Sequence, residues 1–279
     1  MDGPELEPEI LSYYETAWDE DARLRDGMGQ LEFRRTQEIV RRHLPEGVHR
    51  ILDVGGASGV HAEWMLDDGH DVHLIDPVPG HVEAARSHLG ERDGFSAEVG
   101  DGRHLAVADG SFDAVLLFGP LYHLTERADR VQCWSEAHRV LRPGGVAMAA
   151  IISRFASLFS GLSSGDLFDP EFRAVVERDL IDGQHRNPGD KDWFTTAYFH
   201  HPDEVTQEAA KAGLEVEAVL GVEGIATWIP GIDLWWKDPE RRQVVIDAAR
   251  AIESEPTLLG LGPHVVAIAR KPRSTGGTE

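Results

Sequence analysis

Short apolar runs alternate with segments of helical spacing between residues 50 and 152. An apolar run of four to eight residues bounded by turn residues is typical of a buried strand, and apolar positions three and four apart are typical of a helix. The pattern predicts strands near residues 50–54, 71–75, 95–99, 113–118 and 145–152. It predicts helices near 59–68, 79–89 and 126–140. This alternation favours a parallel sheet with helices on both faces.

The segments on either side of residues 50–152 do not show this regular alternation. Residues 30–44 carry apolar side chains at roughly helical spacing, after a polar lead-in over 10–30 that is helical or irregular. After residue 152 the regular alternation stops. We expect helices near 155–161, 169–181 and 201–214, and strands near 215–224 and 264–271. Pro202 suits the first turn of the third helix, and Gly213 suits its end.

These segments predict one domain over residues 1–279, because the length and the 41% hydrophobic content suit a single large core. Its parts are a helical N-terminal cap (1–48), a ligand-binding core (49–152), two substrate or lid segments (153–200 and 225–258) and a flexible tail (272–279). Nine aromatic residues cluster in the two lid segments, where they form either a cover over a substrate or an apolar mini-core or dimer contact. They are Phe155, Phe159, Phe168, Phe172, Trp193, Phe194, Trp228, Trp235 and Trp236.

The chain is strongly acidic, with a formal net charge of −22 and only four lysines. This charge disfavours nucleic-acid partners, because their affinity comes largely from cations placed on phosphates. Dispersed acidity with scarce lysine is also typical of proteins from salt-loving organisms, or of an acidic protein from a GC-rich genome. No apolar run approaches the length of a membrane span, and the N-terminus lacks the regions of a signal peptide. We therefore expect a cytoplasmic protein without membrane partners.

Cys133 is the only cysteine, so the chain forms no internal disulfide and no cysteine-based zinc site. It lies on a predicted helix, where packing is its expected role. No pair of histidines has a metal-binding spacing, so no metal site is predicted.

The stretch Asp53-Val54-Gly55-Gly56-Ala57-Ser58-Gly59 joins the first strand to the first helix of the alternation. Glycines allow a sharp turn and bring a ligand close to the backbone. The helix that follows presents unpaired N–H groups. The second strand ends in Asp76, whose carboxylate suits a ribose diol. A nucleotide ligand is therefore predicted, although the dinucleotide fingerprint G-x-G-x-x-G fails whether it starts at Gly55 or at Gly56.

The ordered motifs resemble those of class I S-adenosylmethionine-dependent methyltransferases over residues 51–152. The family's first motif, acidic-x-Gly-x-Gly-x-Gly, matches here with Ala57 in place of the middle glycine. "GDGRHL" and "FDAVLLFGPLYHL" resemble later motifs, and "RVLRPGG" resembles the turn before the fifth strand. The resemblance implies a Rossmann-like, seven-stranded, mostly parallel sheet with an antiparallel last strand and a helical lid insertion. It implies S-adenosylmethionine as the cofactor, bound by Asp53, Gly55, Ala57, Gly59, Asp76, Pro77, Asp101, Gly102, Phe118, Gly119 and Tyr14.

The resemblance also suggests catalytic candidates. His123 follows the fourth strand beside the expected donor and is a candidate general base, since the pKa of histidine lies near neutrality. A wall or capping residue is the alternative for the same position. His200 is a second candidate near the lid, with a surface histidine as its alternative. Tyr13 and Arg35 are candidates to contact the methionine end of the cofactor, and Glu223 to approach the substrate.

The sequence favours an enzyme that methylates an O or N atom of a small organic molecule, acting as a monomer or a homodimer. Two alternatives stay open: an RNA or protein methyltransferase, and a regulator that binds S-adenosylmethionine without catalysis. The acidity counts against the first, and Ala57 gives slight support to the second.

Overall fold

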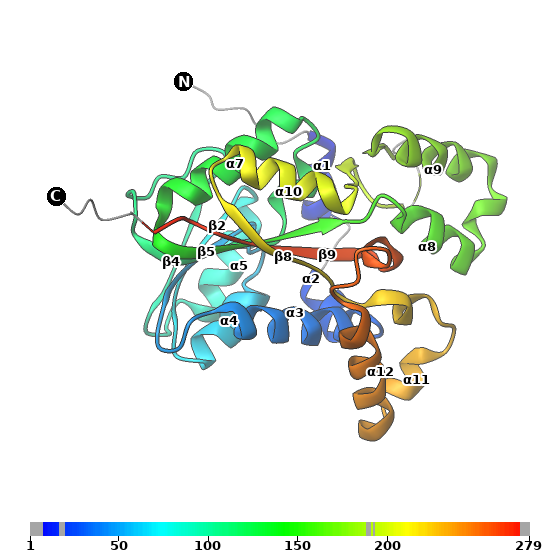
Figure 1. The fold of residues 1–279 in the computed structure, drawn as a ribbon, viewed down its shortest axis with the longest axis horizontal. Helices are drawn as coiled ribbons and strands as arrows, with labels where there is room; N and C mark the ends of the chain where they lie inside the picture. Colours follow the sequence, from blue (N-terminus) through cyan, green and yellow to red (C-terminus); the bar gives the residue numbers. More distant parts are fainter. Residues whose placement is uncertain (1–7, 17–19, 188–190, 192, 274–279) are drawn as a thin grey trace.

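A seven-stranded sheet forms the centre of the protein (Figure 1). The computed structural model describes residues 8–16, 20–187, 191 and 193–273. The strand order is β3-β2-β1-β4-β5-β9-β8. The strands are β1 (Arg50–Val54), β2 (Asp71–Asp76), β3 (Phe95–Val99), β4 (Phe112–Leu117), β5 (Leu141–Ile152), β8 (Glu215–Gly221) and β9 (His264–Arg270).

The sheet is mostly parallel. Strands β1 to β5 all pair in parallel, whereas β9 pairs antiparallel with both β5 and β8. This arrangement confirms the predicted Rossmann-like fold with an antiparallel last strand. The carboxyl ends of β1, β2 and β4 therefore meet at one edge of the sheet, where open α/β sheets bind their ligands.

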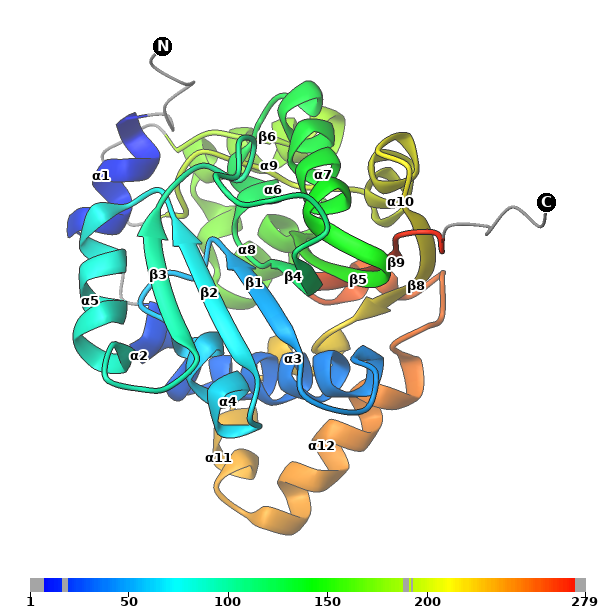
Figure 2. The ribbon, with the colours of Figure 1, turned by 90° about the vertical axis from the view of Figure 1, so that its left-hand side faces the viewer.

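Helices cover both faces of the sheet (Figures 1 and 2). One face packs on α3 (Gly29–His43), α4 (Val60–Asp67) and α5 (Pro79–Leu89), through side chains such as Ile39, Met65 and Val82. The other face packs on α7 (Arg127–Val140) and α10 (Pro202–Lys211), through Trp134 and Val205. Two apolar layers therefore enclose the sheet, as its buried strands require.

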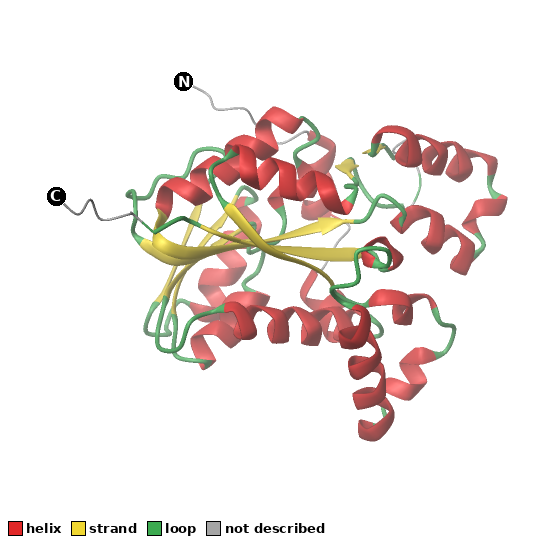
Figure 3. Cartoon of the chain, in the orientation of Figure 1, coloured by secondary structure: helices red, strands yellow, loops and turns green. Residues whose placement is uncertain are grey.

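The remaining helices lie around the ligand-binding edge (Figure 3). β5 runs toward α8 and α9, and α11 and α12 project on the other side of the sheet (Figure 1). These elements are α1 (Pro8–Thr16), α2 (Glu20–Arg25), α6 (Pro120–His123), α8 (Ala156–Ser164), α9 (Pro170–Asp182), α11 (Ile232–Trp236) and α12 (Pro239–Ile252). Shorter pieces are the pair β6 (Gln184–His185) and β7 (Ala197–Tyr198), and the 3₁₀ turns η1 (Asp166–Phe168), η2 (Gly224–Trp228) and η3 (Leu259–Leu261). Among the described residues, no helix combines the length and apolar character that a membrane crossing needs.

Most predicted elements agree with the structure to within two or three residues at each end. The predicted helix over 201–214 ends early, at Lys211, because the chain turns at Gly213 with a φ of 86°. β5 begins at Leu141, before the predicted turn, since Leu141 pairs with Phe112 ahead of an irregularity in the ladder. α6 has four residues, too few to produce a periodic pattern.

Candidate functional site

The glycine turn after β1 leaves no room for larger side chains. Gly55 has a φ of 75°, and a Cβ there would lie 2.9 Å from Pro120 Cδ. A Cβ on Gly56 would lie 2.7 Å from Asp53 Oδ2 and from Leu74 Cγ. Gly59 has a φ of 95° and would meet Leu89 at 2.8 Å. The turn therefore packs tightly against β2, α5 and the start of α6, with its bare backbone exposed to the neighbouring cavity.

Ala57 stands where the family motif has its middle glycine. Its φ is 47°, so among the described residues it is the non-glycine residue in the left-handed region. That conformation costs a residue with a Cβ about 1 kcal/mol. Its amide N–H donates to Asp76 Oδ2 at 2.9 Å. The turn thus keeps the shape of the motif at a small conformational cost.

Two carboxylates border the same cavity. Asp76 is buried and accepts hydrogen bonds from the backbone of Ala57 and Val78 and from His81 Nδ1. A carboxylate offers about four lone-pair positions, so roughly one remains for a ligand hydroxyl. Asp101 is held by Arg103, whose Nε and Nη2 donate to it at 3.0 and 2.6 Å. Both carboxylates are therefore fixed before any ligand arrives.

Asp53 lies beneath the turn and is fully buried. Neither of its carboxylate oxygens has a hydrogen-bond partner among the described residues. Burial, together with the nearby charge of Asp76, raises its pKa to about 7. The acid that opens the motif is therefore not satisfied by the surrounding protein.

The first cavity lies between the glycine turn, the end of β2 and the start of α6. Gly55, Ala57, Asp76, Pro77, Asp101, Gly102, Phe118, Gly119, Tyr14 and His123 are among the residues that line it. The residues fit an adenosyl ligand, because two carboxylates and bare glycine backbone face one narrow space. Gly102 contributes to this fit, since a Cβ there would meet Cys133 Sγ and Val54 Cγ1 at 3.1 Å. Of the predicted cofactor residues, only Asp53 and Gly59 lie behind the wall rather than on it.

Helix α1 covers this cavity through Ile10 and Tyr14. The Tyr14 hydroxyl and His123 Nε2 are joined by a hydrogen bond of 2.7 Å. His123 is buried, and burial lowers its pKa to about 4, so its imidazole is neutral at pH 7. Its Nδ1 has no partner among the described residues. Tyr13 packs edge-on against Phe194 of the lid segment, with ring centroids 5.9 Å apart.

A second cavity of about 370 Å³ adjoins the first. Tyr14, Phe118 and Tyr122 line both cavities and so mark their junction. Four of the nine aromatic lid residues line the second cavity: Phe172, Trp193, Phe194 and Trp228. Phe159 packs behind Trp228, whereas Trp236 is buried in the separate cluster of α11 and α12, and Phe168 is exposed. The lid aromatics thus divide between a cavity wall and a mini-core.

Several polar residues of the second cavity were not predicted from the sequence. Arg23, Glu32, His61, His185 and His264 line it, from five different elements. Only His61 had a local signal, because it lies in the first helical turn after the glycine motif. The others converge through the fold alone. Glu223, a predicted substrate contact, lies behind His264 and is almost fully buried.

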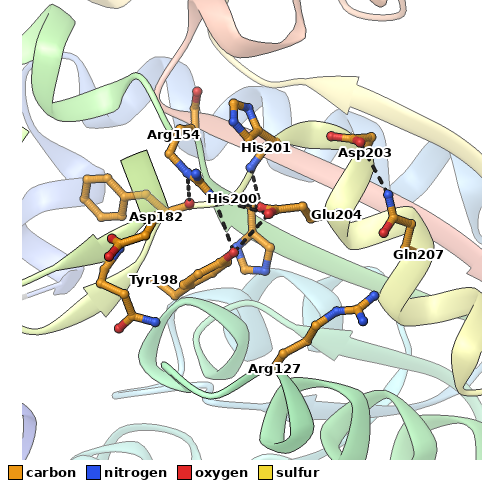
Figure 4. A network of polar contacts seen from close by, with 12 residues as sticks. Arg127, Arg154, Asp182, Tyr198, His200, His201, Asp203, Glu204 and Gln207 are labelled. Carbon is orange, nitrogen blue, oxygen red and sulfur yellow. Dashed lines mark hydrogen bonds and ion pairs between the residues drawn. The ribbon is translucent and has the colours of Figure 1, made fainter. Parts of the chain in front are cut away.

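His200 and Arg35 do not reach either cavity. His200 is fully buried with its Nε2 3.4 Å from Glu208 Oε2, because the chain there passes beneath α10. Figure 4 shows Arg154, Tyr198 and Glu204 joined by polar contacts beside it. The structure therefore does not bring His200 together with His123. Arg35 is buried against Glu38 and Glu253 and donates to the carbonyl of Val222, away from the cofactor cavity.

The described histidines and carboxylates include one group with metal-like proximity. Ligand atoms of Glu32, Glu223 and His264 lie within 4.8 Å of one another. Arg23 donates to both oxygens of Glu32, and His264 Nδ1 lies 2.5 Å from Glu223 Oε1. The cationic side chains already balance these carboxylates, so the group is an ion-pair cluster.

Sequence comparisons agree with the motif reading. Residues 52–149 match the family described as "Methyltransferase domain". Methyltransferase GfsG of Streptomyces halstedii is 33% identical over 134 residues, which are 46% of this chain and 47% of that protein. The ubiquinone biosynthesis O-methyltransferase of Ruegeria pomeroyi is 31% identical over 171 residues, 60% of each chain. The chain thus spans about half the length of the curated relatives it matches.

Solved structures support the same fold. The PH0226 protein of Pyrococcus horikoshii superposes with a TM-score of 0.60 at 15% identity, over 94% of this chain and 99% of that one. A putative methyltransferase of Haloferax volcanii, solved with the Trm112 activator, gives a TM-score of 0.59 at 19% identity, over 96% and 100%. The matched domain, the strand order and the cavity beside the glycine turn lead to one assignment. Residues 52–149 form a methyltransferase domain, and the chain has the fold of solved S-adenosylmethionine-dependent methyltransferases, whose cofactor is S-adenosylmethionine.

Proposed function

We propose that the protein transfers a methyl group from S-adenosylmethionine to an O or N atom of a small organic molecule. The observation that carries this proposal is the junction of the two cavities at Tyr14, Phe118 and Tyr122. Bound S-adenosylmethionine supplies an activated methyl group. What remains for the protein is to align the acceptor atom with that group and to exclude water.

The cavity dimensions favour a small acceptor. A volume of about 370 Å³ lies in the ordinary range for small-molecule sites. Its aromatic walls suit an apolar or planar body. A net charge of −22 opposes an RNA substrate. On the same grounds we propose that residues 153–200 and 225–258 serve as substrate segments.

We propose that Tyr14 and His123 together receive the proton that the acceptor loses. Tyr14 borders the acceptor cavity, and its hydroxyl contacts Nε2 of the neutral His123. A proton taken up at the tyrosine oxygen can therefore pass to the imidazole without crossing open water. Burial of the imidazole limits how long it holds that charge.

The cellular location and the salt environment of the protein are part of the same proposal. We propose a cytoplasmic enzyme adapted to high salt, because acidic side chains are dispersed along the chain and lysines are few. A homodimer is compatible with this proposal, but the proposal does not require one.

Calorimetry with S-adenosylhomocysteine, at low and at molar KCl, tests the cofactor site. We expect binding that weakens about tenfold or more in Asp76→Asn, since a hydrogen bond to a charged group is worth roughly 1.5–3 kcal/mol. Asp233→Asn, an exposed position on α11, is the matched control. Transfer of labelled methyl groups to small molecules of a cell extract then tests turnover. Absence of cofactor binding at both salt concentrations rules out the proposal.

A further inference from the structure

The acceptor cavity has a polar wall formed by residues outside the two lid segments. Arg23 from α2, Glu32 from α3, His61 from α4 and His264 from β9 form this wall, with Glu223 behind it. None of these residues has a role in the cofactor site. The chemistry of the wall therefore bears on which molecule occupies the cavity.

The proton positions on His61 follow from its neighbour. Trp64 Nε1 lies 3.2 Å from His61 Nδ1, and an indole N–H can only donate. Nδ1 is therefore the unprotonated nitrogen. Burial lowers the pKa of His61 to about 4, so the ring is neutral at pH 7 and carries its proton on Nε2. Among the described residues Nε2 has no hydrogen-bond partner, so His61, which lines the cavity, carries an unused donor.

The proton positions on His264 follow from Glu223. Nδ1 donates to Glu223 Oε1 at 2.5 Å, and it lies 3.5 Å from Glu32 Oε2. Burial alone would lower the pKa of His264, but the two carboxylates outweigh it and raise the pKa to about 9. The ring is therefore an imidazolium at pH 7. Its Nε2–H, like that of His61, has no partner among the described residues.

The formal charges that line the cavity balance in number, since Asp166 lines it as well as Glu32. His264 and Arg23 are cations at the wall, and Glu223 is only 2% exposed behind His264. Glu32 is the one carboxylate of the wall itself. Arg23 donates to both of its oxygens, at 2.5 and 2.8 Å, so that its charge is already compensated. An anionic oxygen thus meets two N–H donors and a compensated carboxylate.

We propose that His61 and His264 form an anchor for an anionic oxygen of the methyl acceptor, such as a carboxylate or phenolate on an aromatic body. This inference rests on the proposed function and specifies its substrate class. The ring of His61 packs against the ring of Phe118 at the junction of the two cavities, with the ring centroids 5.4 Å apart. An acceptor anchored there extends its apolar body along the aromatic lid and presents another atom to the methyl group. Both histidines are positioning residues.

Three naphthalene probes of similar size and different charge test the anchor by calorimetry in the presence of S-adenosylhomocysteine. They are 2-naphthoate, 2-naphthamide and 2-naphthylmethylamine. We expect naphthoate to bind roughly tenfold or more tightly than naphthamide at pH 7.5, because charge-assisted hydrogen bonds are the stronger ones. The preference is present below pH 9 and is lost as the pH rises through 9, where His264 loses its proton. Naphthol, tested above and below its own pKa, distinguishes a phenolate from a carboxylate.

Variants of the two histidines test whether these residues produce the preference for naphthoate. His264→Gln and His61→Gln should each remove most of the preference for naphthoate while S-adenosylhomocysteine binds as before. His88→Gln, an exposed histidine on α5, is the matched control. If His264→Gln does not fold, the pH dependence of the natural protein and the His61 variant still decide.

Equal affinity for naphthoate and naphthamide, tighter binding of the amine, or no binding of naphthoate at millimolar concentration would each overturn the anchor. Cofactor binding measured in the same preparation separates the two hypotheses. A protein that binds S-adenosylhomocysteine but shows no charge preference contradicts the anchor alone. A protein that binds no cofactor contradicts the proposed function.

Discussion

Replacing Asp53 with asparagine should make the protein more stable at neutral pH. Asp53 is fully buried, and neither of its oxygens has a partner among the described residues. Its pKa is raised to about 7 from an ordinary value of 3.8. One unit of pKa corresponds to about 1.4 kcal/mol, so the ionised carboxylate costs the folded protein roughly 4 kcal/mol above pH 7.

The sign of the pH dependence follows from the direction of this change. The folded state holds the proton of Asp53 over a range in which the unfolded chain has lost it. Its contribution to stability therefore becomes unfavourable as the pH rises from about 4 to about 7. Asparagine resembles the protonated acid at every pH. Asp53→Asn should thus gain up to roughly 4 kcal/mol relative to the natural protein between pH 4 and pH 8.

Urea denaturation at several pH values measures this gain as a free energy of unfolding. Burying an asparagine amide also costs stability, but that cost does not vary with pH. The change with pH in the difference between the two free energies of unfolding therefore reports on the carboxylate of Asp53. Asp233→Asn is exposed and should show no slope. The same Asp53 variant should bind S-adenosylhomocysteine more weakly if the carboxylate serves the cofactor. A difference in stability that is constant from pH 4 to pH 8 would refute the reasoning.

Three further predictions concern the turn, a buried ion pair and the surface charge. Ala57→Gly should change the free energy of unfolding by less than about 1 kcal/mol, because relief of the left-handed conformation offsets the greater entropy of the unfolded chain; a loss of several kcal/mol in urea would contradict this. Glu208→Gln should cost roughly 3 kcal/mol, since it leaves the buried Arg130 without its counter-charge, and a melting temperature within a degree of the natural one would disprove that role. The melting temperature of the natural protein should rise in molar KCl, which screens its net charge of −22, and an unchanged value would remove the proposal of adaptation to salt.

The core of the fold was predictable because its signals are local. An apolar run that ends at Asp53 and continues into glycines specifies a strand, a turn and a helix within a few residues. The same holds for Asp76, which lies at the end of its strand and on the cofactor cavity as expected. The order of these motifs was enough to indicate the methyltransferase domain that the comparisons find over residues 52–149.

The acceptor cavity was less predictable because its residues come together only through the fold. Glu32 and His264 lie more than two hundred positions apart in the chain, yet their side chains are 3.5 Å apart. Nothing in the neighbourhood of either residue indicates the other. The opposite holds for His200. Its position in the sequence beside the lid predicted a place at the cavity, but its side chain is buried against Glu208 of α10 and lines neither cavity. Local pattern thus predicted the residues that line the first cavity and left most polar residues of the second cavity unassigned.

Helix α1 contacts both ligand spaces at once, and this has a consequence for the kinetics. Tyr14 closes the nucleoside space while Tyr13 supports Phe194 on the wall of the neighbouring one. When this helix detaches, both compartments open together. We therefore expect the two ligands to be coupled: each, by holding the helix in place, should slow the release of the other.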